Sequence, residues 1–233
     1  MYGKVGVNVN VDSASGADLP FERVSEHVGE TRYQFIERLA KMRNLHMVDD
    51  QNGALNLIRG ETAGSTTLVE GQNILKGRIL IRNSLAVSLV DMQCQNFGNN
   101  QHNGPDAAQI NVQVPNSNYT GSYRPYTVMA EMPTNQAGCQ MRANHEINLN
   151  DQQICEALIT VQGWLMDDGT LWINHLREAV TINSPMLVPS NPFTLLLRGV
   201  KHMQNSEEGT TTELNLCIPR GIGSGLMVNI PGT

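Results

Sequence analysis

The sequence has little charge and few aromatic side chains. Charged residues make up 16% of its 233 positions and aromatic residues 5%. Sixteen Lys and Arg against twenty-two Asp and Glu give a net charge of −6, and neither sign forms a block. This balance does not indicate a basic face for nucleic acid. No segment approaches the roughly 20 consecutive apolar residues that a bilayer crossing needs, so we expect no membrane insertion.

Cysteine is also scarce, with four residues at positions 94, 139, 155 and 217. No two of them have the spacing of a metal-ligand pair, and the start of the sequence lacks the successive regions of a secretory leader. We therefore expect free, mostly buried thiols in a reducing compartment. Cys94 and Cys217 lie in apolar runs, where burial makes a thiol inert.

The residues that are abundant predict a β-rich protein. Hydrophobic residues make up 40% of the chain, enough for one sizeable core or two small ones. Asn, Gln, Ser, Thr and Gly fill the intervals between short apolar runs, which is typical of strands joined by many turns. The sequence thus predicts an α+β fold that is mostly β.

The N-terminal third contains the clearest local patterns. Valines alternate with polar residues through residues 5–11, which predicts a half-buried strand. The segment "GETRYQFIERLAKMRNLH" has the apolar spacing of a helix, and Thr31 with Gln34 forms a capping box at its start. Glu37 and Lys41 form an i,i+4 pair on its outer face. Two short apolar runs on either side of residues 49–53 then predict a hairpin.

The rest of the sequence predicts further strands and one more helix. Small polar residues at 61–67 mark a boundary, so we expect a small α/β domain at 1–67, a β-rich domain at 68–219 and a flexible tail at 220–233. The expected elements are strands at 74–81 and 85–94 joined by a short polar turn, a strand at 110–114, a helix at about 135–148, a hairpin at Asp168-Gly169, and late strands joined across Glu207-Glu208-Gly209.

The acidic loop at residues 49–53 invites comparison with a calcium-binding EF-hand loop. Counting back from Gly53 as position 6, Asn52 and Asp50 fall at ligand positions. Position 1 is Val48 and position 12 is Arg59, so two of the main ligands are missing. The loop therefore reads as a tight Asn-Gly turn flanked by solvated carboxylates.

The other acidic pairs and the histidines form no recognised catalytic motif. Asp167-Asp168 and Glu207-Glu208 are adjacent residues at turns, where shared water does not raise a pKa as a general acid requires. The six histidines are scattered, and His102, in "NNQHNG", is the best single candidate for recognition or a pH response. We find neither G-x-S-x-G nor a phosphate-binding glycine loop. We predict no catalytic, metal-binding or cofactor-binding residues, no cofactor and no enzyme activity.

Several longer segments together resemble one family. The stretches are "PFERVSEHVGETRYQFIERLAKMRNLHMVDDQNGALNLIRG", "LVEGQNIL", "CQNFGNNQHNGPDAAQ", "GWLMDDGTLWINHLREAVTINSPML", "LLLRGVKHMQ" and "GTTTELNLCIP". In this order they resemble the Mu-type baseplate hub (tail) protein family of contractile-tailed phages and, more distantly, the late-control-protein and VgrG hub modules. The resemblance extends from about Pro20 to Pro219.

The resemblance implies a structural role at the centre of a phage baseplate. Family members are homotrimers built of tail-tube-like β-barrels that join the tail tube protein to the central spike protein, beside other baseplate proteins. DNA passes through their lumen without specific binding, and the acidic balance of this sequence suits such a channel. The expected location is the virion tail baseplate, after assembly in the host cytoplasm. Family chains carry an additional N-terminal barrel, so this sequence is expected to begin partway through the family pattern.

Two alternative functions remain open at this point. A hub that also cleaves peptidoglycan would need a separated Asp/Glu pair or a metal site in a cleft. A VgrG-like tip of a type VI secretion system or of a tail-like bacteriocin would share the architecture but act in a different setting.

Overall fold

The computed structural model describes residues 6–11, 20–21, 23–97, 104, 108–119, 121–188 and 192–219. In these ranges the protein is mostly β with two α-helices, which confirms the predicted fold class. The chain forms two compact units. Unit 1 comprises residues 1–49, 53–59 and 87–149, and unit 2 comprises residues 50–52, 60–86 and 150–233. The predicted domain boundary at residue 67 stays a prediction. The predicted tail at 220–233 lies outside the described residues.

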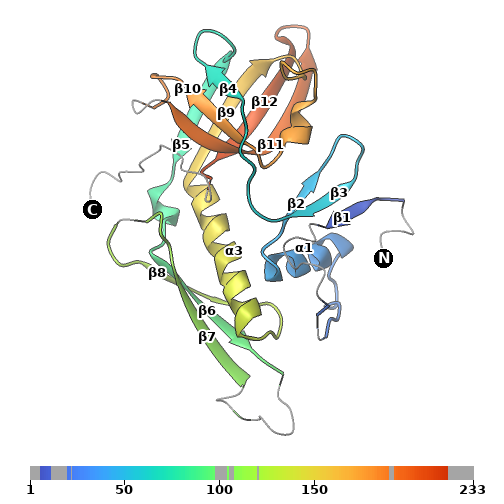
Figure 1. Ribbon diagram of the computed structural model, residues 1–233, viewed down its shortest axis with the longest axis vertical. Coiled ribbons are helices and arrows are strands. Elements are labelled where there is room, and N and C mark those ends of the chain that lie inside the picture. Colours follow the sequence, from blue (N-terminus) through green and yellow to red (C-terminus); the bar gives the residue numbers. More distant parts are fainter. Residues whose placement is uncertain are drawn as a thin grey trace. The chain divides into compact units, whose positions relative to one another are not determined.

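The first part of unit 1 contains a helix and a small sheet (Figure 1). Its elements are β1 (Val9–Val11), α1 (Arg32–Met42), β2 (His46–Asp49) and β3 (Leu55–Ile58). The strand order is β1-β3-β2, with β2 antiparallel and β1 parallel to β3. The predicted hairpin is confirmed. Of the described residues 6–11, the predicted strand is present only at Val9–Val11, and its residues are exposed instead of half-buried, so that part of the prediction is wrong.

Helix α1 begins as the sequence predicts. The backbone N–H of Gln34 donates to Thr31 Oγ1 at 3.3 Å, and the backbone N–H of Thr31 donates to Gln34 Oε1 at 2.9 Å. Lys41 Nζ lies 2.9 Å from Glu37 Oε1 on the outer face. These are contacts between residues three or four apart, which is why the sequence alone predicts them.

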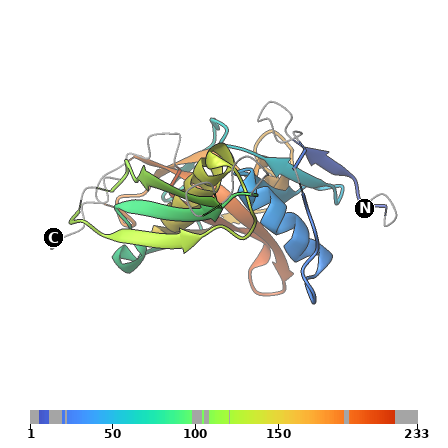
Figure 2. The same cartoon turned by 90° about the horizontal axis from the view of Figure 1, so that it is seen from below.

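The second part of unit 1 is a three-stranded sheet covered on one face by a helix (Figures 1 and 2). It contains β6 (Leu89–Gln95), β7 (Gln109–Pro115), β8 (Pro125–Met129) and α3 (Gln136–Ile154), with strand order β7-β6-β8. Strand β7 is antiparallel and β8 parallel to β6. Every second residue of β6 and β7 is buried and packs with Cys139, Ala143 and Ile147 of α3.

Unit 2 is built on one six-stranded sheet. Its strands, in spatial order, are β4 (Thr67–Val69), β10 (Ala179–Asn183), β11 (Phe193–Asn205), β12 (Gly209–Cys217), β9 (Cys155–Gln162) and β5 (Lys76–Ile81). Strand β4 is parallel to β10, and the other neighbours are antiparallel. The sheet curls into a half-barrel, so within the described residues β4 and β5 are its two edges. Two 3-10 helices, η3 (Asn83–Leu85) and η4 (Trp172–His175), lie in the connections.

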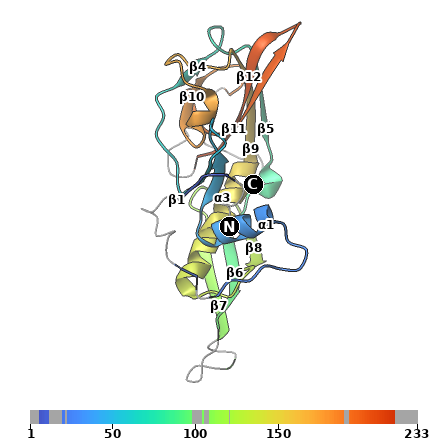
Figure 3. The same cartoon turned by 90° about the vertical axis from the view of Figure 1, so that its right-hand side faces the viewer.

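The core of unit 2 follows the alternation of its long strands. Residues at every second position of β9 and β12 are buried, and Phe193 and residues 195–197 of β11 are almost fully enclosed. Strands β11 and β12 form one long hairpin, visible in orange and red in Figure 3. Gly209 has φ +70° at its turn, a conformation that favours glycine. The predicted hairpin across residues 207–209 is confirmed.

Two connections differ from their predictions. The runs at 74–81 and 85–94 were predicted to be joined by a short polar turn, but β5 pairs with β9 and β6 pairs with β7 and β8 in another sheet. Helix η3 lies between them. At Asp168-Gly169 the chain turns with a single antiparallel bridge between Leu165 and Leu171 instead of paired strands. Which strands pair is decided by contacts distant in sequence, so local patterns did not reveal it.

Candidate functional site

The acidic loop at residues 49–53 is a turn stabilised by its own side chain. Asp50 Oδ1 accepts a hydrogen bond of 2.8 Å from the backbone N–H of Asn52. Gly53 has φ +73°, whereas Asn52 is not among the residues with positive φ. The predicted turn at Asn52-Gly53 is therefore present, although only Gly53 has a positive φ, and the Asp50 side chain helps to close it. Within the described ranges, no group of three His, Cys, Asp or Glu side chains could hold a metal ion.

In the turns at Asp168 and Glu207-Glu208, side-chain oxygens also accept hydrogen bonds from residues two or three positions further along the chain. Asp168 Oδ1 accepts hydrogen bonds from the Thr170 hydroxyl at 2.6 Å and from its backbone N–H at 2.9 Å. These bonds hold the pKa of Asp168 below its ordinary value. Asn205 Oδ1 accepts from the backbone N–H groups of Glu207 and Glu208. The Lys76 ammonium, bonded to the Glu208 carboxylate, keeps the pKa of Glu208 low as well. Neither carboxylate has the raised pKa of a general acid.

Beside Asp168, a hydroxyl, an imidazole and a carboxylate lie in a row. No sequence motif indicated this arrangement. Thr170 Oγ1 lies 2.7 Å from His175 Nε2, and His175 Nδ1 lies 2.9 Å from Glu178 Oε2. This is the order of groups in a hydrolytic triad. However, the Thr170 hydroxyl also bonds to Asp168, whose carboxylate competes with the imidazole for its only proton. The four side chains therefore fasten the loop before β10 and do not form an activated nucleophile.

The cysteines differ from the prediction of four free thiols. Cys94 of β6 and Cys139 of α3 form a disulfide, with a Cα–Cα distance of 6.1 Å. The two residues are 45 positions apart, so only the packing of α3 on the sheet brings them together. Cys155 and Cys217 are free and buried, and burial raises their pKa values to about 11 and about 12. These two thiols are inert, as predicted for Cys217.

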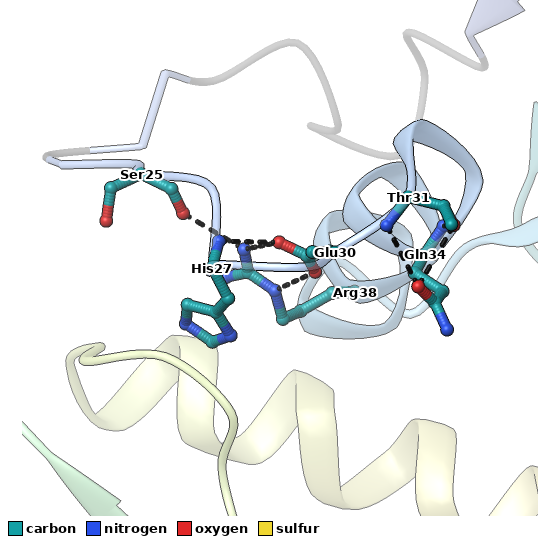
Figure 4. A network of polar contacts seen from close by, with 6 residues as sticks. All are labelled: Ser25, His27, Glu30, Thr31, Gln34 and Arg38. Carbon is teal, nitrogen blue, oxygen red and sulfur yellow. Dashed lines mark hydrogen bonds and ion pairs between the residues drawn. The ribbon is translucent and has the colours of Figure 1, made fainter.

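A buried ion pair holds the segment before α1 (Figure 4). Arg38 Nε donates to Glu30 Oε1 at 2.8 Å, and Arg38 Nη2 donates to Glu30 Oε2 at 2.7 Å. The same Nη2 donates to the Ser25 carbonyl at 3.0 Å, and the backbone N–H of His27 donates to Glu30 Oε2 at 3.0 Å. These bonds, led by the one from Arg38, lower the pKa of Glu30 from its ordinary 4.5 to about 2.

This ion pair predicts a defined dependence of stability on pH. A carboxylate whose pKa is lower in the folded state stabilises the protein above pH 4.5, and this contribution disappears as the pH falls from 4.5 to about 2. Thermal unfolding should therefore show that Glu30→Gln is less stable than the parent protein at pH 5, and that the difference shrinks at pH 3. A difference that is the same at both pH values would contradict this assignment.

Two further arginines are buried, one in each unit. Arg142 of α3 is 4% exposed and contacts Glu131 and Glu146. Arg177, with φ +71°, is 5% exposed and donates from Nε and Nη2 to the Gly60 carbonyl at 3.3 and 3.1 Å. Burial lowers the pKa of Arg177. No sequence motif indicated these sites, because arginine is usually exposed and the partners Glu131 and Gly60 lie in other segments of the chain.

The histidines lie in separate environments. His102 lies outside the described residues. In unit 1, His46 of β2 and His145 of α3 have ring centroids 5.1 Å apart. In unit 2, His202 of β11 packs 5.9 Å from the Trp164 ring, and burial lowers its pKa.

Within the described part of the chain, no helix is both long and apolar enough to span a bilayer.

The comparisons with known proteins identify a phage tail fold. Residues 2–59 match the family model described as baseplate hub protein gp44-like, second domain. No curated protein sequence matches the chain at a significant level.

Solved structures of tail proteins share the architecture of nearly the whole chain. The 43 kDa tail protein of prophage MuSo2 from Shewanella oneidensis aligns with a TM-score of 0.73 at 22% identity, over 94% of this chain and 62% of that one. The tail protein of Neisseria meningitidis MC58 aligns with a TM-score of 0.68 at 22% identity, over 90% and 61%. Prophage tail protein gp18 of Listeria monocytogenes EGD-e aligns with a TM-score of 0.53 at 9% identity, over 94% and 62%. This chain thus spans less than two thirds of each of these proteins.

Proposed function

We propose that this chain, which carries a gp44-like baseplate hub domain at residues 2–59 and the fold of Mu-type tail proteins, is a structural subunit of a phage baseplate hub. In this proposal three copies form an adaptor that joins the tail tube protein to the central spike protein of a contractile tail. The observation that carries the proposal is the hub-domain match, in a chain whose fold follows a MuSo2 tail protein over 94% of its length.

The side-chain chemistry supports a structural role over a catalytic one. The carboxylates of the acidic turns are bonded locally, and the Thr170 hydroxyl beside His175 is shared with Asp168. The peptidoglycan-cleaving alternative would need a carboxyl group with a raised pKa. The pKa values that depart from the ordinary range for Asp and Glu are all lowered in the described residues. A VgrG-like tip would use the same architecture with different partners.

The role in the assembled tail follows from charge and from open strand edges. A net charge of −6 disfavours the adhesion of phosphate groups, which suits a hub through which DNA passes without specific binding. Both described sheets of unit 1 and the half-barrel of unit 2 end in strands that pair on one side only, and such open edges can pair with a neighbouring subunit. We place the protein in the virion baseplate after assembly in the host cytoplasm, beside other baseplate proteins.

The mass of the protein in solution tests the proposal. We expect native mass spectrometry across the micromolar range to show a species of three times the 25.6 kDa of one chain, growing with concentration. A protein that remains monomeric over this range, alone and with its tail tube protein present, would contradict the trimeric adaptor. A closed dimer would contradict it as well.

A further inference from the structure

The sheet β7-β6-β8 has almost no charge. Asp91 is the only charged residue in its three strands, all of which are described, and Asp91 Oδ1 is shielded from solvent. The face turned away from α3 carries Asp91 in its central strand and the exposed Met129 at its end, and around them amides and a hydroxyl: Gln93, Gln95, Gln109, Asn111, Gln113 and Thr127. We call this sheet the amide sheet. Surfaces that contact other proteins are depleted in charge at their centre, so its composition indicates an interface.

Both edges of the amide sheet are open and uncharged. Within the described residues, β7 and β8 each pair only with β6. Their sequences, "QINVQVP" and "PYTVM", contain no Lys, Arg, Asp or Glu. Met129 of β8 is 66% exposed and Tyr126 is 42% exposed. Edge strand β5 of unit 2 carries Lys76 and Arg78, the kind of charged residues that protect an edge from pairing. The uncharged edge strands β4 and β1 have only three residues each, so β7 and β8 are the longer uncharged edges.

The net negative charge of the chain makes an uncharged surface the most favourable place for two copies to meet. Two copies that each carry −6 repel one another through acidic surfaces. An uncharged surface avoids that repulsion, and open strand edges supply backbone donors and acceptors in a row. The proposed function arranges copies of this chain around one axis, and this makes a second copy the partner for these edges.

The number of copies decides which edges meet. If the same edge of two copies pairs, β8 with β8, the result is a dimer to which no third copy can add in the same way. If two different edges pair, each copy keeps one free edge, and the copies form a ring when their rotation adds up to a full turn. We propose that β8 of one copy adds to β7 of the next, so that the amide sheets join edge to edge around the ring. This inference rests on the proposed function for the number of copies.

Pairing of β8 with β7 of another copy buries only a small area, and this decides which experiment can detect it. An edge strand of five residues is about 17 Å long, so its pairing buries much less than the roughly 1,600 Å² of a standard interface. Other contacts then contribute to the trimer, and its mass alone does not report on this edge. The experiment must therefore detect the neighbours of β8 directly.

Photo-cross-linking from β8 provides this test. A photoreactive amino acid replaces Met129 in the full chain, and isotope-labelled and unlabelled protein are mixed before irradiation and mass spectrometry. We expect mixed-isotope cross-links from position 129 to residues 109–115 of another copy. The same group at Tyr33, which is 60% exposed on α1, is the matched control and should give no cross-links to residues 109–115.

A charge placed in β8 should abolish the cross-link. Thr127→Lys in the cross-linker protein adds an edge charge on the exposed face, away from the core. We expect loss of the mixed-isotope product, whereas Tyr33→Lys in the same background should leave it unchanged. Cross-links confined to one copy, cross-links to other segments, or a yield that Thr127→Lys does not alter would overturn the inference. A trimer without the 129-to-β7 product overturns only this contact, whereas the absence of any trimer overturns the proposed function.

Discussion

Replacing Arg142 by methionine is expected to lower the free energy of unfolding by about 3 kcal/mol, the lower end of the cost of breaking a buried ion pair, because the Glu146 side chain is nearly buried whereas the Glu131 side chain is partly exposed. Arg142 Nε and Nη2 donate to the two carboxylate oxygens of Glu131 at 2.8 and 2.6 Å. Nη1 donates to Glu146 at 2.6 Å. Methionine fills similar space but leaves both carboxylates without their cation. Urea unfolding followed by circular dichroism measures the loss.

The pH dependence of this loss identifies its cause. Burial by itself raises the pKa of Glu131, but the hydrogen bonds and charge of Arg142 outweigh burial and lower it. Without Arg142, Glu131 should take up a proton more readily, so the variant should be closer to the parent protein at pH 5 than at pH 7. The matched control is Lys41→Met at the exposed pair with Glu37, which should cost no more than about 0.5 kcal/mol. A loss below about 1 kcal/mol for Arg142→Met would contradict the prediction.

Replacing Gly64 by alanine is expected to lower the free energy of unfolding by about 3 kcal/mol, the upper part of the usual range for overpacking. A Cβ at this position would overlap the backbone oxygen of Ala179 and lie 3.1 Å from its carbonyl carbon. The chain is held against β10 here by hydrogen bonds of 2.9 Å from Ala179 N–H to Thr62 and from Thr181 N–H to Thr66. A backbone atom cannot move aside as a flexible side chain can, so the segment must separate from β10. Thermal and urea unfolding both report this change.

Gly199 of β11 is the control for Gly64, which lies in the segment before β4. A Cβ at Gly199 would lie 3.7 Å from Asn215 Cβ, an ordinary contact, and its φ is outside the left-handed region. Gly199→Ala should therefore be neutral, or stabilise the protein by about 0.4–1 kcal/mol, because alanine lowers the conformational entropy of the unfolded chain. If Gly64→Ala and Gly199→Ala had equal effects, close backbone packing would not be the reason for glycine at 64.

Local features were predictable because they depend on residues close in sequence. The capping box of Thr31 and Gln34, the pair Glu37–Lys41 and the turn at Gly209 each involve residues no more than four positions apart. The strand at 110–114 followed from alternation of apolar and polar residues, because one of its faces packs on α3. Strand β8 had no predicted counterpart, since "PYTVM" lacks such alternation.

The features that matter for the candidate site depend on tertiary contacts. The Cys94–Cys139 disulfide joins residues 45 positions apart. The burial of Arg142 could not be predicted either, because its partner Glu131 comes from the loop before α3. By contrast, the Thr170–His175–Glu178 alignment is local, since its two hydrogen bonds span five and three positions, and the turn at Gly169 and helix η4 bring the groups together.

The sequence by itself determined the fold class, the position of α1 and its cap, and the resemblance to Mu-type baseplate hub proteins, because each is recorded in composition, short spacings or the order of segments. Only the tertiary structure decided which strands share a sheet, which charges are buried, and that β6, β7 and β8 together leave two uncharged edges open. Strand pairing and burial depend on contacts between segments far apart in the chain, and no local pattern encodes them.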